Sequence, residues 1–148
     1  MNLSPCWILF LPFIAFAVIP LIPERKRFLA GWIACAAIFA AFLLTLKLAL
    51  PLFQGLPFSP SERSIEWISI SGLQLEFGFL IDSLSLLMLL VVTGVGSLIF
   101  YYSLEYMEED EGFRRYFAGL SLFAFSMIGI VISNNLLQLF IFWELVGL

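Results

Sequence analysis

The sequence predicts an all-α polytopic membrane protein with about four full transmembrane helices, a truncated fifth helix and a small β-hairpin on the outer face. Of its 148 residues, 62% are hydrophobic and 12% charged, with a mean hydropathy of +1.06. Soluble domains are about 45–50% apolar and about 25% charged. The apolar residues gather into runs of about 20, the length of a helix that crosses the hydrocarbon core. One further stretch alternates with the period of a strand.

Four hydrophobic runs predict full spans. The first, at about 5–22, contains Pro12, which should kink the helix, as membrane helices tolerate. No basic residue precedes this run, so we expect an uncleaved helix rather than a signal peptide. The other three runs predict spans at about 28–50, 79–103 and 114–133.

A fifth run occupies residues 135–148 and is a partial span. Its 14 residues fall short of the roughly 20 that a spanning helix needs. We therefore expect the chain to be the amino-terminal part of a longer membrane protein, with residues 1–148 forming one unit.

The outer segment at about 64–78 predicts the β-hairpin. Residues 68–71 and 73–77 alternate between apolar and polar side chains, and Gly72 lies between them as a turn residue. A two-stranded hairpin is marginal alone, so we expect it to pack on the helices or on a partner.

Basic residues predict the orientation. Because each span crosses the membrane once, the first and third loops lie on the same side. Their basic residues are Arg25, Lys26, Arg27, Arg114 and Arg115. Only Arg63 lies in the second loop. The positive-inside rule then predicts that residues 23–27 and 104–113 are cytoplasmic and the N-terminus outside. The membrane is expected to be a bacterial inner membrane.

Composition excludes several classes of site. Histidine is absent and no basic patch of the kind that binds nucleic acid occurs. Cys6 and Cys35 stand apart in apolar runs, where they are expected to act as small apolar residues. No glycine-rich phosphate loop, nucleotide fingerprint or cysteine cluster is present. We therefore expect this chain to bind no cofactor or metal and to carry no redox site.

Glu144 is the strongest candidate for a functional residue. It follows Asn135 by nine residues, which places it about 13 Å deep along a helix, near the middle of the hydrocarbon core. An ionisable group there costs about 2.5–3.5 kcal/mol on insertion scales. The alternatives are a proton relay and a structural carboxylate held by a neighbouring helix.

Asp82 and the loop of residues 105–115 are weaker candidates. Asp82 precedes the third span, where it is expected to cap the helix, with a role in proton entry or exit as the alternative. The charged loop is expected to be a solvated turn, and the alternative is that it docks to a neighbouring protein of a larger complex.

These sequence features resemble the chain 5 (subunit L) family of proton-pumping NADH:quinone oxidoreductase, respiratory complex I. The resemblance is carried by Phe79–Met88, Val91–Gly96, Tyr102–Met107, Arg115–Phe117, Leu122–Met127 and Asn135–Leu148. Its most specific part is the string Trp143–Leu148 together with the helix start at Asp82. The family often has aspartate where Asn134 stands.

The resemblance implies an antiporter-like membrane subunit. It implies that Glu144 pairs with a lysine on a later helix as part of a proton channel. It also implies other membrane subunits of complex I as partners, and NADH, FMN, iron–sulfur clusters and quinone in other subunits. The alternatives are the large antiporter-like subunit of a multisubunit cation/proton antiporter and a non-functional truncated membrane fragment.

Overall fold

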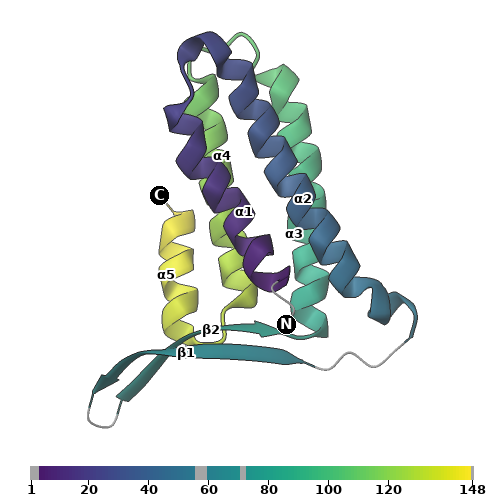
Figure 1. The fold of residues 1–148 in the computed structure, drawn as a ribbon, viewed down its shortest axis with the longest axis vertical. Helices are drawn as coiled ribbons and strands as arrows, with labels where there is room; N and C mark the ends of the chain where they lie inside the picture. Colours follow the sequence, from purple (N-terminus) through teal and green to yellow (C-terminus); the bar gives the residue numbers. More distant parts are fainter. Residues whose placement is uncertain (1–3, 56–59, 71–72, 148) are drawn as a thin grey trace.

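The computed structural model describes residues 4–55, 60–70 and 73–147. Its helices stand side by side, and a hairpin lies across one end of the bundle (Figure 1). The helices are α1 (Ser4–Val18), α2 (Arg27–Phe53), α3 (Ser83–Tyr106), α4 (Phe113–Ile132) and α5 (Leu136–Val146), with short 3₁₀ turns η1 (Ile19–Leu21) and η2 (Glu24–Lys26). The predicted fold class, an all-helical membrane protein with a small antiparallel hairpin, is confirmed.

The first helix is shorter than the predicted span. α1 has 15 residues and gives way to η1 at Ile19, next to Pro20, which has no backbone N–H to donate. Three helical segments in the described ranges are long and apolar enough to cross a membrane: Glu24–Phe53, Ser83–Tyr106 and Phe113–Ile132. α1 and α5 are shorter apolar helices.

The hairpin is longer than predicted at both ends. β1 (Ser61–Ile70) pairs with β2 (Leu73–Ile81) in antiparallel register from Ser61 opposite Ile81, with an irregularity between Glu66 and Ile68. Residues 79–81, predicted to open the third span, belong to β2, because α3 begins only after the cap at Asp82. The predicted turn residue Gly72 lies outside the described residues.

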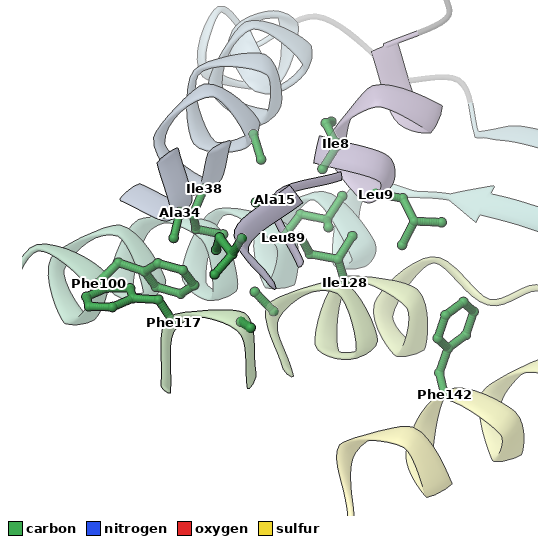
Figure 2. Close-up of a cluster of buried hydrophobic side chains, with 14 of the residues drawn as sticks. Ile8, Leu9, Ala15, Ala34, Ile38, Leu89, Phe100, Phe117, Ile128 and Phe142 are labelled. Atoms are coloured by element: carbon green, nitrogen blue, oxygen red, sulfur yellow. The ribbon is translucent and has the colours of Figure 1, made fainter. Parts of the chain in front are cut away.

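The core is a layer of apolar side chains between α1, α2, α3 and α4. Figure 2 shows Ile8, Ile38, Leu89, Phe117 and Ile128 converging there, each fully buried. Small residues let the backbones approach, as helix packing in lipid favours. A Cβ on Gly31 would overlap Leu104 and the Phe113 ring, so α2 packs closely there against the end of α3 and the start of α4.

Four buried hydroxyl groups bond within their own helices, each donating to the carbonyl four residues earlier at 2.6–2.9 Å: those of Thr45, Thr93, Ser121 and Ser126. The buried Ser103 hydroxyl of α3 instead lies 3.0 Å from the Tyr116 hydroxyl of α4. The first four side chains therefore enter the apolar interior with their donors satisfied.

Polar contacts join the two loops at the end opposite the hairpin (Figure 1). Arg27 donates to the carbonyl of Glu108 at 3.0 Å. Arg114 donates to the carbonyl of Ile22 and pairs with the Glu24 carboxylate. These contacts fix the start of α2 and the start of α4 against the neighbouring loops.

Candidate functional site

Glu144 lies in the last turn of α5, on the side that faces away from the bundle. Phe142, two residues earlier, is 4% exposed and packs against Phe77 and Phe125, with ring centroids 6.5 and 5.4 Å apart. Two residues correspond to about 200° around a helix, so Glu144 projects opposite Phe142. Its side chain is exposed, and within the described residues its carboxylate makes no hydrogen bond or ion pair.

The surroundings of Glu144 on this face are apolar. The other exposed side chains of α5 are those of Leu136, Leu137, Phe140, Ile141 and Trp143. In Figure 1, α5 rises beside α4 and ends about halfway along the bundle. The carboxylate thus stands at mid-height on an apolar helix face.

Asn135 and Gln138 anchor the start of α5. The Asn135 side chain caps the helix by accepting from the backbone N–H of Gln138 at 2.8 Å, and its amide donates to the carbonyl of Glu76 at 2.6 Å. Gln138 is 2% exposed, and its side-chain oxygen accepts from the backbone N–H of Gly78 at 3.0 Å. Two polar side chains therefore join α5 to strand β2.

Gly78 makes this junction possible by having no side chain. A Cβ there would overlap the Asn134 side chain and lie 2.7 Å from the carbonyl oxygen of Arg63. An isolated bridge between Phe79 and Ser133 ties the same strand to the α4–α5 turn. We call the set Gly78, Asn134, Asn135 and Gln138 the hairpin latch.

Asp82 is the N-cap of α3. Its Oδ1 accepts from the backbone N–H of Ser85 at 2.7 Å. Hydrogen bonds from Ser85 lower the pKa of the Asp82 carboxyl below its ordinary value, because they favour the ionised form.

The two predicted site residues are not brought together. Asp82 caps the start of α3 and Glu144 lies in α5, and the two helices lie on different sides of the bundle (Figure 1). Among the described residues, no group of three or more Cys, Asp or Glu side chains is arranged to hold a metal ion.

Sequence reasoning missed the role of Gln138 and Gly78. The available signal was a single glutamine in an apolar helix, three residues after an asparagine cap. A buried amide needs partners: the Gln138 oxygen accepts from a strand N–H, while its Nε2 is buried with no partner among the described residues.

Sequence comparisons relate most of this chain to one family of known proteins. Residues 67–117 match the family model described as NADH-Ubiquinone oxidoreductase (complex I), chain 5 N-terminus. NAD(P)H-quinone oxidoreductase chain 5 of Synechocystis is 55% identical over 86 residues, which is 58% of this chain and 13% of that protein. The chloroplastic subunit 5 of Glycine max is 39% identical over 150 aligned residues, covering 96% of this chain and 20% of that protein.

A solved structure shares the fold. The Mrp complex from Dietzia sp. contains a chain that aligns with a TM-score of 0.71 and 27% sequence identity, over 96% of this chain and 15% of that chain. The chain therefore spans between about an eighth and a fifth of the length of the relatives it matches.

Proposed function

Because the chain belongs with the amino-terminal part of the complex I chain 5 family, we propose that it contributes to proton translocation by an NADH:quinone oxidoreductase, coupled to NADH oxidation and quinone reduction. The observation that carries the proposal is Glu144, a single carboxylate on the exposed apolar face of α5. The helices and the relatives make the chain an integral membrane protein.

The proposed role of Glu144 is to take up and release a proton. A carboxylate at mid-membrane costs about 2.5–3.5 kcal/mol, so it is retained where it does work or has a partner. Its orientation away from α1–α4 leaves it accessible to a further helix. In this proposal that helix supplies the lysine that the family resemblance implies.

We propose the other membrane subunits of the complex as partners. NADH, FMN, iron–sulfur clusters and quinone would be bound by other subunits. This chain would supply part of the proton path and no redox step.

The second candidate function is that of the large antiporter-like subunit in a multisubunit cation/proton antiporter. The likeness to a chain of the Mrp complex favours it, since that structure aligns with nearly the whole chain. The two functions make different predictions in cells. Deleting the gene would abolish NADH:quinone activity in the first case, and cation efflux without any change in NADH oxidation in the second.

The test of the first function is Glu144→Gln in the full-length protein. Glutamine keeps the shape and hydrogen-bonding capacity of the side chain and cannot ionise. We expect assembly to survive and proton transfer to fall on the order of a hundredfold, as when an acid–base group is lost. The measurement is pumping in inverted membrane vesicles, normalised to assembled complex.

The matched control is Glu109→Gln, which neutralises an exposed loop carboxylate. It should pump at the wild-type rate, and Glu144→Asp should do less harm than Glu144→Gln. Wild-type pumping by Glu144→Gln, together with failed assembly of Glu144→Ala, would make the carboxylate structural.

We further propose that the hairpin end of the bundle faces outward. Arg25, Lys26, Arg27, Arg114 and Arg115 all lie at or next to the opposite end, which the positive-inside rule assigns to the cytoplasm. The N-terminus would then lie outside. We also propose a bacterial inner membrane as its location.

A further inference from the structure

Three surface cavities meet at Arg115, in the first turn of α4. The largest, about 530 Å³, lies between the α3–α4 loop and α4 and also includes Asp110. A second, about 400 Å³, lies towards Phe16 and Pro20 of the α1 end. A third, about 370 Å³, includes Glu111. Arg115 thus lines all three of these cavities.

The largest cavity continues into an apolar groove between α3 and α4. An adjacent cavity of about 210 Å³ shares Leu120 and Phe123 with the largest one and extends to Gly96 and Met127. We call the two together the α3–α4 groove. From Gly112 to Met127 the chain rises about 22 Å along the helix. Half of a bilayer with its headgroups is about 20–22 Å, so the groove has the length of one lipid in one leaflet.

The groove has open space at Gly119, where the chain has no side chain. A Cβ added there would meet no atom within 4 Å, and Gly119 lines both of the two largest cavities. At Gly31, by contrast, a neighbouring helix fills the space. The glycine in α4 therefore leaves open space rather than permitting a close helix contact.

Arg115 has no partner in the described part of the chain, and the same holds for Arg25 and Lys26 of the first loop. Arg27 bonds to two loop carbonyls, and Arg114 is held by Ile22 and Glu24. Arg115 is exposed and makes neither a hydrogen bond nor an ion pair with the described residues. A cation at the mouth of an apolar groove suits the phosphate of a lipid headgroup.

Two carboxylates that line the same cavities as Arg115 restrict which lipid headgroups would fit the site. Asp110 lines the same cavity as Arg115, and Glu111 lines the adjacent one. A headgroup with net negative charge would meet both carboxylates, whereas a headgroup that carries a phosphate and a primary ammonium would match both signs. A free phosphate would leave the apolar groove empty.

We propose that the α3–α4 groove binds one phosphatidylethanolamine-type lipid, with its phosphate on Arg115, its ammonium on Asp110 and one acyl chain along Leu120 and Phe123. The site belongs to the leaflet that contains the α3–α4 loop. It is independent of the proton-transfer role of Glu144, which lies on a different helix, and it is measured without turnover.

The test uses the complete protein complex in nanodiscs and a phosphatidylethanolamine with a photoreactive group in its acyl chain. Cross-linked peptides are mapped by mass spectrometry. Label is expected on the peptides that contain Gly96 and Met127. Unlabelled phosphatidylethanolamine should compete better than phosphatidylcholine or phosphatidylglycerol, and inorganic phosphate should not compete.

Substitutions then test the charges of the site separately from the open space of the groove. Arg115→Gln should lower labelling about fivefold, the effect of one interfacial cation, while Arg115→Lys should keep most of it. Gly119→Leu should also lower labelling, by filling the groove. Asp110→Asn should remove the preference for phosphatidylethanolamine over phosphatidylcholine. The matched controls Arg25→Gln, Ala36→Leu and Glu109→Gln should label like the wild type.

The proposal is wrong if Arg115→Gln or Gly119→Leu labels like the wild type. It is also wrong if phosphatidylglycerol competes as well as phosphatidylethanolamine, or if neither helix is labelled. Retained labelling in Arg115→Lys shows that the loss in Arg115→Gln reflects the missing charge or bonding group and not a misfolded chain.

Discussion

Asp82 and Glu144 are both carboxylates, yet their surroundings differ. Asp82 lies before the first turn of α3 and accepts a backbone hydrogen bond there. Glu144 lies on the exposed face of α5 and makes no hydrogen bond or ion pair within the described residues. The first carboxylate is satisfied by its own helix, and the second depends on groups beyond it.

Substitution at Asp82 can separate capping from proton transfer. Asn is as good an N-cap as Asp but cannot ionise. We expect Asp82→Asn to keep wild-type stability and pumping, and Asp82→Ala to lower the melting temperature of the purified protein. A loss of pumping in a well-assembled Asp82→Asn variant would place Asp82 in the proton path.

The pH dependence of this cap follows from the lowered pKa. The folded-state pKa of Asp82 lies below its unfolded value. The stabilisation is therefore fully present at neutral pH and is lost as the pH falls through the lowered pKa. The melting-temperature difference between Asp82→Ala and the wild type should accordingly shrink in strong acid.

At the scale of single residues, the sequence predicted the helix caps better than the contacts between residues far apart in the chain. The helix starts after Asp82 and Asn135 follow from short-range rules, because a cap bonds to a residue three positions later. The bond between Gln138 and Gly78 joins residues 60 positions apart. Short-range rules say nothing about it, and an apolar pattern around Gln138 hides it.

The elements at the hairpin end form one unit through the hairpin latch. β2, the α4–α5 turn and α5 are joined by side-chain to backbone bonds and by the packing of Phe142 on Phe77. A shift of the hairpin would therefore move the helix that carries Glu144. The strand ends could not be placed from the sequence, because residues 79–81 are apolar enough to continue the following helix.

The latch predicts a stability effect at Gln138. Gln138→Leu removes the acceptor and leaves the buried N–H of Gly78 without a partner, at a cost of about 1–3 kcal/mol. The loss should appear as a lower melting temperature and as faster hydrogen exchange in β2.

The control for this substitution is Gln54→Leu, which changes an exposed glutamine at the end of α2. It should melt like the wild type. Unchanged exchange in β2 of the Gln138→Leu variant would mean that the hairpin is held by packing alone.

The molecule as a whole has two chemically different ends. The loop end gathers most of the basic side chains, and Arg114 pairs there with the Glu24 carboxylate, while the other end carries the hairpin. Hydropathy and helix parity predicted this arrangement from the sequence alone, since every crossing reverses the chain. What they could not predict is that the first helix changes from α-helix to a 3₁₀ turn at Ile19.

Labelling from either side of the membrane tests the orientation. In a background with Cys6 and Cys35 replaced by alanine, a reagent that cannot cross the membrane should reach Ser61→Cys from outside. Glu109→Cys should react only after the inner face is opened. The reverse pattern would overturn the proposed topology.

The self-bonded hydroxyls of the bundle have a consequence for where charge can move. Four buried hydroxyls each donate their proton to a carbonyl of their own helix: those of Thr45, Thr93, Ser121 and Ser126. The buried side chains of the described residues include no carboxylate and no lysine. A relay of protons needs groups that can both accept and donate. These four hydroxyls therefore offer no free donor to a proton path, and in our proposal protons reach Glu144 from the side of α5 that faces away from the α1–α4 bundle.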